Sequence, residues 1–366
     1  MSEEVPNNAE TMLTELDNLD REMADLLGKR RALSRKLAAY KLSNDQAPMD
    51  YSQETRIMER MESACSENGA GREWGTKLGR LLADCTLEAH SRLMDRRTSA
   101  GQRKILIIGG LGKMGSWLAD FVYHQGHDVL IYDPGGKHKD YANASSLEEG
   151  IKDAELIIVS VSLSRSPEVM RQLVALKPEG VVCDLCSIKK NLLPIYREAL
   201  AARISLTSLH PLFGPGTRSL HGQNIVVCTC GDTRADAAIC ALFSETAANL
   251  VTMTPEEHDH LMGLTLSMSH AVNMLFARAV AHSGEKFERL NAVASATWNK
   301  QMKTTCEVAG ENMDLYFEIQ RQCDFRRIYE SMEKEAATLK TLLGEDRRSE
   351  FKKEMEVVAD YFEPNR

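Results

Sequence analysis

Apolar residues near the start of the chain recur every three or four positions, which is the spacing of amphipathic helices. The first pattern predicts one long helix, ended by a loop that contains Asn44, Asp45 and Pro48. Further helical patterns follow over residues 52–66 and 72–95, and the polar stretch 96–103 is typical of a linker. Residues 1–98 therefore predict an all-α domain. The apolar positions of the long helix are Met12, Leu16, Leu19, Met23, Leu26, Leu33 and Leu37.

The pattern changes after this linker, where short apolar runs alternate with helical stretches. Alternating strands and helices predict a doubly wound, Rossmann-type α/β domain over residues 99–252. Residues 253–366 lack strand signals and predict a second all-α domain. The candidate strands are 104–109, 128–132, 155–161, 180–184, 204–208 and 224–229.

The first of these strands leads into a glycine-rich turn. Gly110, Gly112 and Gly115 fit the spacing G-x-G-x-x-G, and a helix is predicted over residues 114–124. In this motif the first glycine makes a tight turn, the second lets the backbone approach a pyrophosphate, and the third lets the helix pack against the strand. The helix N-terminus, near Met114, directs N–H groups and its positive dipole end at phosphates. The turn therefore predicts a dinucleotide site.

Asp133, at the end of the next predicted strand, indicates which dinucleotide binds. An acidic residue there accepts hydrogen bonds from the ribose 2′-hydroxyl and repels a 2′-phosphate, so NAD is favoured over NADP. We also place Ser160 in the cofactor site. The alternative is an ordinary strand-to-helix turn with an incidental aspartate.

Composition argues against several classes of partner. The 366 residues are enough for two or three domains, with an ordinary balance of 43% apolar and 27% charged residues. The net charge of −8 argues against nucleic acid, whose phosphates need clustered cations. No apolar stretch is long enough for a membrane span, and the acidic start of the chain is not typical of a signal peptide. We therefore expect no membrane partner and a cytoplasmic location.

Neither a disulfide framework nor a metal site is predicted. The nine cysteines lack a framework spacing and are typical of reduced thiols. Cys183 and Cys186 form a C-x-x-C pair, but Cys183 lies in a strand-like run, so packing is favoured over redox chemistry. His258 and His260 are two positions apart on a predicted helix and point apart, which argues against a shared metal.

His210 is the candidate proton acceptor. It directly follows a predicted strand, near the carboxyl edge of the sheet where ligands bind in this fold, and a histidine suits proton transfer at neutral pH. Ser187 and Lys189 also follow a strand. Ser187 could hydrogen-bond the substrate or orient His210, and Lys189 could hold a carboxylate or the cofactor. His270, in an apolar helical stretch, is a further candidate. The alternatives are structural: a loop cap for His210, helix capping or surface charge for Ser187 and Lys189, and packing for His270.

Two cations interrupt the apolar stripe of the first helix. Arg30 lies between Leu26 and Leu33, and Lys41 follows Leu37 by one turn. Because cations on a core-facing stripe are costly without an anion, a helical domain with this pattern could bind a small dicarboxylate. The alternative is that both side chains reach solvent at the edge of a helix bundle.

The order of these features resembles the bifunctional chorismate mutase–prephenate dehydrogenases of enteric bacteria. The helical start is followed by Gly-Leu-Gly-Lys-Met-Gly at 110–115, Asp-Leu-Cys-Ser-Ile-Lys at 184–189, Leu-His-Pro-Leu-Phe-Gly-Pro at 209–215 and Glu-His-Asp at 257–259. The third motif is the most specific, and the resemblance covers nearly the whole chain. It implies a homodimer that oxidises and decarboxylates prephenate to 4-hydroxyphenylpyruvate with NAD, on the route to tyrosine.

The resemblance also implies roles for three residues. His210 is expected to accept the proton of the ring hydroxyl, Ser187 to assist it, and His270 to lie in the substrate pocket. As hydride leaves the ring, the hydroxyl proton becomes acidic and a neutral imidazole can take it.

The chain departs from the family pattern at the substrate anchor. Glu307 stands where the family carries an arginine that anchors prephenate, and Asn299 stands where another arginine is expected. Lys300, Lys303 and Arg218 are the candidate replacements, although a lysine cannot reproduce a bidentate arginine clamp.

The mutase domain departs as well. Leu13 and Gln53 stand where family mutases carry arginines that bind the dianionic substrate, so weak or absent mutase activity is expected. The matching positions of this mutase-like site are Arg30, Lys41, Asp50 and Glu54.

Two alternative functions follow from these departures. One is a dehydrogenase for a modified substrate such as 4-amino-4-deoxyprephenate. The other is a non-catalytic regulator that binds NAD or another ligand, against which the intact glycines, Ser187 and His210 argue.

Overall fold

The computed structural model describes residues 9–44, 52–91 and 103–362, and Asp50 of the predicted mutase-like site lies outside them. Two compact units make up the chain. Met1–Val161, Arg165–Cys186 and Pro194–Thr254 belong to the first unit. Ser162–Ser164, Ser187–Leu193 and Pro255–Arg366 belong to the second.

The first unit begins with the predicted helices, α1 (Ala9–Ser43), α2 (Ser52–Glu67) and α3 (Arg72–Ser91). Helices α2 and α3 pack closely because α3 carries glycines at the contact: a Cβ on Gly75 would lie 2.5 Å from the Met61 carbonyl oxygen. Helix α1 packs on α3 but, with 35 residues against 20, is much longer. Part of its apolar stripe is therefore uncovered: the exposed fractions are 57% for Leu16, 55% for Leu19 and 65% for Met23. The expectation that the apolar stripe of α1 faces a core is wrong within the described chain.

An eight-stranded sheet forms the rest of the first unit, in the order β3-β2-β1-β4-β5-β6-β7-β8. All pairs are parallel except β6 with β7. The six predicted strands are confirmed, while β3 and β8 were not predicted, because β3 has two residues and β8 is a largely exposed edge strand without an apolar run. The strands are β1 (Lys104–Ile108), β2 (Asp128–Tyr132), β3 (Ala142–Asn143), β4 (Leu156–Val159), β5 (Val181–Asp184), β6 (Leu206–Pro211), β7 (Asn224–Cys228) and β8 (Asn249–Met253).

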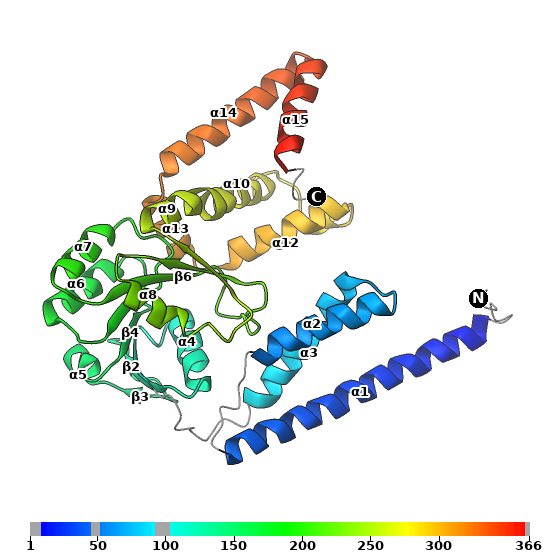
Figure 1. Cartoon of the computed structure of the whole chain (residues 1–366). Coiled ribbons are helices and arrows are strands. Elements are labelled where there is room, and N and C mark those ends of the chain that lie inside the picture. The colour runs from blue at the N-terminus through cyan, green and yellow to red at the C-terminus, as the bar shows by residue number, and fades with distance from the viewer. Residues whose placement is uncertain (1–8, 45–51, 92–102, 363–366) are drawn as a thin grey trace. The chain divides into compact units, whose positions relative to one another are not determined.

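Helices cover both faces of the sheet. The strand order reverses between β1 and β4, so right-handed crossovers place the helix after β1 on one face and the helices after β4 and β5 on the other (Figure 1). Stacked rings of Phe121 and Phe243, with centroids 5.0 Å apart, join helix and loop over the core. The helices are α4 (Lys113–His124), α5 (Leu147–Ile151), α6 (Ser166–Leu176), α7 (Leu193–Ala201) and α8 (Thr233–Cys240).

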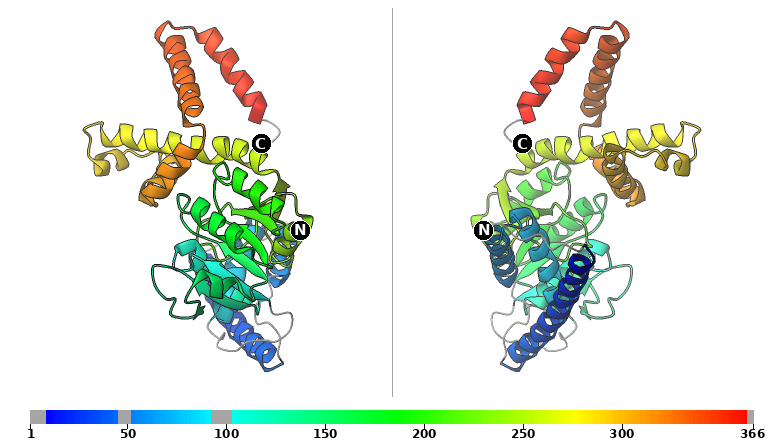
Figure 2. Two further views of the ribbon diagram at one scale, coloured as in Figure 1. Left: turned by 90° about the vertical axis from the view of Figure 1, so that its left-hand side faces the viewer. Right: turned by 90° about the vertical axis from the view of Figure 1, so that its right-hand side faces the viewer.

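The second unit is helical, as predicted. A π-helical turn, Gly263–Met268, joins its first two helices, and its last two form a hairpin whose arms diverge (Figure 2). In the part of the chain that the structure describes, no helix is both long and apolar enough to cross a membrane. The helices are α9 (Pro255–Met262), α10 (Ser269–Ala281), α11 (Phe287–Asn291), α12 (Ala296–Gly310), α13 (Met313–Gln322), α14 (Phe325–Gly344) and α15 (Arg348–Phe362).

Candidate active site

The glycine-rich turn between β1 and α4 forms a close-packed cradle. Gly109 has φ +86°, and a Cβ there would lie 2.5 Å from the Ser160 carbonyl oxygen at the end of β4. A Cβ on Gly115 would lie 2.3 Å from the Gly109 carbonyl oxygen, which confirms that this glycine lets the helix approach the strand. The tight turn, however, is made by Gly109 and not by Gly110, whose missing Cβ instead leaves room for the side chain of Ile131.

The start of α4 suits a phosphate group. Gly112 is the N-cap and has no side chain, and the first turn of the helix contains no acidic residue. The first backbone N–H groups of a helix have no partner inside it, and the helix dipole adds positive charge there. Met114 lies in this first turn. The cradle therefore fits the pyrophosphate of a dinucleotide.

Asp133 is held beside this turn. Its carboxylate accepts hydrogen bonds from the backbone N–H groups of Leu111, at 3.1 Å, and Gly135, at 2.8 Å. Ser160 follows β4, the strand on the other side of β1, and its N–H donates to the Ile108 carbonyl at 2.8 Å. The predicted cofactor residues thus gather at the carboxyl ends of β1, β2 and β4, where the strand order reverses.

His210 belongs to the same sheet edge but not to a loop. The predicted strand 204–208 extends further, because β6 pairs with the antiparallel β7 as far as Pro211, and His210 pairs with Val226 inside the ladder. The His210 side chain is 5% exposed. The backbone at His210 is therefore fixed by strand pairing, and the expectation that this residue follows the strand is corrected.

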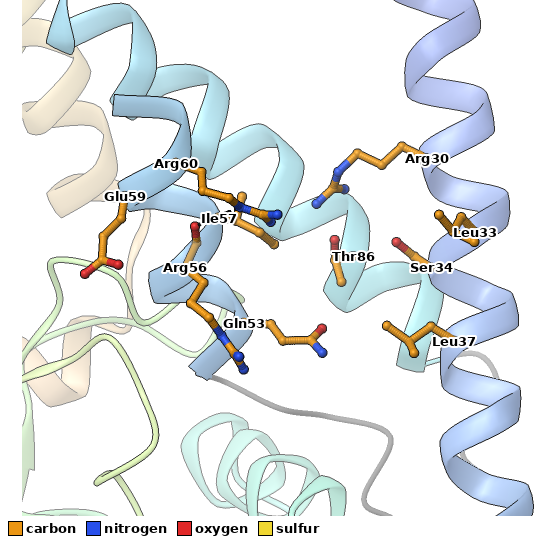
Figure 3. Close-up of a pocket in the computed structure, with 10 residues that line it drawn as sticks. All are labelled: Arg30, Leu33, Ser34, Leu37, Gln53, Arg56, Ile57, Glu59, Arg60 and Thr86. Atoms are coloured by element: carbon orange, nitrogen blue, oxygen red, sulfur yellow. Dashed lines mark hydrogen bonds between the residues drawn. The ribbon is translucent and has the colours of Figure 1, made fainter. Parts of the chain in front are cut away.

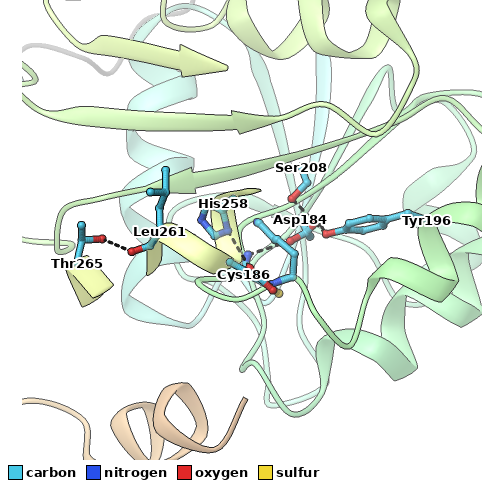
Figure 4. Close-up of polar contacts among 9 residues, drawn as sticks. Asp184, Cys186, Tyr196, Ser208, His258, Leu261 and Thr265 are labelled. Carbon is cyan, nitrogen blue, oxygen red and sulfur yellow. Dashed lines mark hydrogen bonds and ion pairs between the residues drawn. The ribbon is translucent and has the colours of Figure 1, made fainter. Parts of the chain in front are cut away.

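A buried polar network lies at the ends of β5 and β6 (Figure 4). The Asp184 carboxylate accepts hydrogen bonds from the Tyr196 hydroxyl at 2.7 Å and from the Cys186 N–H at 3.0 Å. The hydroxyl oxygens of Tyr196 and Ser208 are 3.2 Å apart. Burial and the neighbouring Asp184 charge raise the pKa of Tyr196 well above its ordinary value, so this hydroxyl remains a donor. Sequence reasoning missed the network, although a carboxylate that ends an apolar strand was a visible signal.

The C-x-x-C pair is not a disulfide. Cys183 and Cys186 are free and buried, and the Cys186 thiol donates to the Ser166 hydroxyl with the two heavy atoms 3.0 Å apart. Their burial agrees with the prediction that these cysteines serve packing.

In the second unit, the segment that carries Ser187 and Lys189 is tied to α9. The Lys189 backbone N–H donates to both oxygens of Asp259, at 2.8 and 3.1 Å. Because a carboxylate only accepts, the buried His258 donates to Asp259 from Nδ1 over 2.9 Å. Ser187 is half-buried and Lys189 is fully buried, so Lys189 is not a solvated surface charge. Asp259 was not predicted as a site residue, although the Glu-His-Asp motif contains it.

His270 lies on α10 against Tyr316 of α13, with ring centroids 4.2 Å apart. Burial lowers the pKa of His270, and its buried Nδ1 has no hydrogen-bond partner among the described residues. The pKa of Tyr316 is raised by burial and then by the charges of Glu311 and Glu307. Glu307, which stands where the family arginine is expected, thus lies near the aromatic partner of His270.

The candidate replacements for the missing arginine belong to both units. Lys300 and Lys303 are exposed on α12 of the second unit. Arg218 is exposed in the first unit, where its charge acts on the Asp84 carboxylate of α3. The structure therefore does not single out one of them as the anchor.

A cavity of about 600 Å³ lies between the helices of the N-terminal domain, and Arg30 of the predicted mutase-like site lines it (Figure 3). Arg30 donates from Nη1 to the Leu82 carbonyl at 2.9 Å, and its pKa is lowered mainly by burial and also by the nearby Arg60 charge. The lining residues are Arg30, Leu33, Ser34, Leu37, Gln53, Arg56, Ile57, Glu59, Arg60 and Thr86.

Two predicted members of this site do not line the cavity. Lys41 is half-buried in the last turn of α1. Glu54 is buried, and its side chain contacts residues outside the cavity. Its carboxylate accepts hydrogen bonds from the Ser219 hydroxyl and, at 3.1 Å, from the His221 N–H. Arg56 and Arg60, which sequence reasoning missed, line the cavity one and two turns beyond Gln53.

Three family models match consecutive parts of the chain. Residues 12–90 match chorismate mutase type II. Residues 121–252 match the prephenate dehydrogenase nucleotide-binding domain, and residues 254–357 match the prephenate dehydrogenase dimerization domain.

Similar proteins support the same assignment. A probable arogenate/prephenate dehydrogenase of Methanocaldococcus jannaschii is 22% identical, with 70% of this chain and 60% of that protein covered. T-proteins of Enterobacter agglomerans and Haemophilus influenzae are 25% and 21% identical, covering 59% and 84% of this chain and 56% and 79% of their own lengths. The chain thus spans less than two thirds of the length of the first two of these relatives.

A solved structure shows the same fold. Prephenate dehydrogenase from A. aeolicus superposes with a TM-score of 0.59 at 17% identity, over 73% of this chain and all of that one. Synechocystis arogenate dehydrogenase does so with a TM-score of 0.54 at 16% identity, over 72% and 98%. The chain belongs to the prephenate dehydrogenase family and carries a chorismate mutase type II domain before the dehydrogenase part.

Proposed function

We propose that this chain oxidises and decarboxylates prephenate to 4-hydroxyphenylpyruvate with NAD. The observation that carries the proposal is a dinucleotide cradle at the β1–β4 reversal with a buried histidine on the same sheet edge. The A. aeolicus relative was solved with NAD⁺ and hydroxyphenyl propionate, an aromatic acid that resembles the expected product. Relatives with these names give no support to a modified ring substrate or a non-catalytic regulator.

The residues divide the work of the reaction. NAD, when held by the cradle at Gly112 and by Asp133, would supply the acceptor for the hydride of ring carbon C4. His210 accepts the proton of the C4 hydroxyl as that carbon becomes a carbonyl. The bond from the ring to its carboxylate then breaks and CO2 leaves. The electron pair of that bond completes the aromatic ring, and the former carbonyl oxygen, now a phenolate, takes back the proton that His210 accepted. Ser187 hydrogen-bonds the substrate, and His270, neutral because of its lowered pKa, offers it a further contact.

The test is NADH formation by the purified full chain with NAD and prephenate. Replacing His210 with Asn should lower kcat by about 100-fold to 10,000-fold, the usual contribution of a general base. His282→Asn, an exposed histidine after α10, is the matched control and should leave kcat unchanged. Unchanged turnover in His210→Asn, or no turnover of prephenate by the wild type, would overturn the proposal.

For the N-terminal domain we propose a binding site for a small dicarboxylate, with weak or no mutase activity. Three guanidinium groups and one carboxylate, that of Glu59, line its cavity, so cations outnumber anions there, and the carboxylate of Glu54 does not line it. Arg30→Ala should weaken chorismate binding at least tenfold in calorimetry, while Arg35→Ala, exposed on the same helix, should not. Rapid conversion of chorismate by the wild type would show a working mutase and refute the second half of this proposal.

We further propose a homodimer in the cytoplasm. The family model for residues 254–357 is described as a dimerization domain, and the helices there expose large apolar side chains such as Leu343 and Val357. All nine cysteines are free thiols, which agrees with a reducing compartment.

A further inference from the structure

Three buried polar side chains lie in one region at the carboxyl end of the sheet. Asp184 ends β5, Ser208 is its register partner on β6, and Tyr196 reaches them from α7. The exposed fractions are 0% for Asp184 and Ser208 and 3% for Tyr196. A buried carboxylate is costly unless it is hydrogen-bonded, so its retention at this place requires an explanation.

The contacts link the network to both segments that carry the proposed catalytic residues. Side chains alternate along a strand, so Ser208 and His210 project from the same face of β6. On the β5 side, Asp184 holds the N–H of Cys186, the residue that immediately precedes Ser187. One carboxylate and one hydroxyl therefore fix the backbone that leads into Ser187 and the strand face that carries His210.

We propose that Tyr196, Asp184 and Ser208 are positioning residues for the dehydrogenase reaction, which hold His210 and the approach to Ser187 in their working geometry. This inference rests on the proposed function. Groups that orient a reacting side chain usually contribute about 10-fold to 100-fold to activity without touching the substrate. Tyr196 suits the role because its hydroxyl stays protonated over the whole working range of pH and can always donate to Asp184.

The same strand offers a matched control. Thr207 lies between Ser208 and Leu206 and projects from the opposite face of β6, where its hydroxyl donates to Asp236 of α8 over 2.6 Å. Like Ser208, Thr207 is fully buried and hydrogen-bonded. Thr207→Val therefore removes a buried hydroxyl from the same strand without touching the network.

The experiment compares Tyr196→Phe, Ser208→Ala and Thr207→Val in the full chain. The first two should lower kcat about 10-fold to 100-fold, leave KM for NAD within about twofold, and shift the pH profile of kcat/KM. Thr207→Val should lower the melting temperature but keep kcat and the pH profile. Should Tyr196→Phe fail to fold, Ser208→Ala alone decides, because it removes only one oxygen atom. If Tyr196→Phe, Ser208→Ala and Thr207→Val all show the same kcat and the same pH profile of kcat/KM, the network is merely structural and the inference is overturned.

A second readout separates this inference from the proposed function. The imidazole resonance of His210, assigned by its absence in His210→Asn, should move in Tyr196→Phe and Ser208→Ala and stay in place in Thr207→Val. This signal needs no substrate, so it tests the positioning role even if prephenate is not turned over. An unmoved His210 resonance in both network variants would overturn the inference whatever the activity.

Discussion

At the scale of single residues, the dinucleotide cradle depends on atoms that are absent. Gly109 and Gly115 approach each other so closely that no side chain fits between them, and only Gly109 uses a positive φ. Sequence spacing identifies the cradle but assigns the tight turn to Gly110, because the motif also begins at that glycine. Whether Gly109 or Gly110 makes the turn depends on the backbone φ angle, which cannot be read from the amino-acid sequence.

The cradle predicts different outcomes for two neighbouring glycines. In Gly115→Ala the new Cβ would meet the Gly109 carbonyl oxygen at 2.3 Å, so α4 must move away from β1. We expect a loss of about 1–3 kcal/mol in unfolding free energy, as for overpacked sites, and at least tenfold weaker NAD binding. Urea denaturation and a fluorescence titration with NAD measure the two effects.

Gly112→Ala is the control for this prediction. Its Cβ would lie 3.2 Å from the same carbonyl oxygen, with an ordinary φ of −67°. Its loss of stability should therefore be smaller, and its effect should fall mainly on NAD affinity. If Gly115→Ala proved as stable as Gly112→Ala, the close contact would not be important for the fold.

Some residues of the candidate sites could be predicted from the sequence, and others could not. Glycine spacing and Asp133 were predictable because both act within one strand–turn–helix unit. Arg56 and Arg60 were not, because their share in the cavity depends on how three helices pack. His210, Ser187 and His270 were candidates from their places in the sequence, their specific roles are implied by a family resemblance, and both stay predictions.

At the scale of elements, periodicity was a reliable guide where one face is buried. The six apolar strands were predicted, whereas the exposed edge strand β8 was not, because its burial alternates weakly. The end of β6 was misplaced because antiparallel pairing with β7 continues through His210 and Pro211, and proline suggests a loop. Pairing between distant segments is not encoded in local pattern.

The helices α14 and α15 carry a prediction about assembly. Leu343 and Val357 are 67% and 68% exposed. Exposed apolar side chains that gather in a patch mark protein–protein interaction sites. If these helices form the proposed dimer, Leu343→Lys with Val357→Lys should place charges in its interface and shift the chain to monomers in sedimentation velocity. Lys334→Ala, exposed on α14, should leave the dimer intact. A dimer that survives the double lysine variant at micromolar concentration would remove these helices from the interface.

At the scale of the whole molecule, buried titratable groups define the pH range of stability. Burial lowers the pKa of His124, His127 and His270 below the ordinary value of 6.5. Below pH 6.5 these histidines bind more protons in the unfolded chain than in the folded chain, so stability is lost as the pH falls. Burial raises the pKa of the Cys323 thiol from 9.0 to about 11. Between these values only the folded chain keeps this proton, so stability is lost as the pH rises.

The melting temperature should therefore be highest between about pH 6.5 and 9 and fall on both sides. His270→Gln should flatten part of the acidic decline, because glutamine does not titrate, while His282→Gln, at an exposed position, should not. Cys323→Ser should reduce the alkaline decline, since its hydroxyl does not ionise in this range. Melting curves by circular dichroism from pH 5 to 11 would measure the effects of all three substitutions. If the melting temperature instead rose as the pH was lowered from 6.5 to 5, the buried histidines would bind protons more tightly in the folded chain. That is the opposite of what their burial requires.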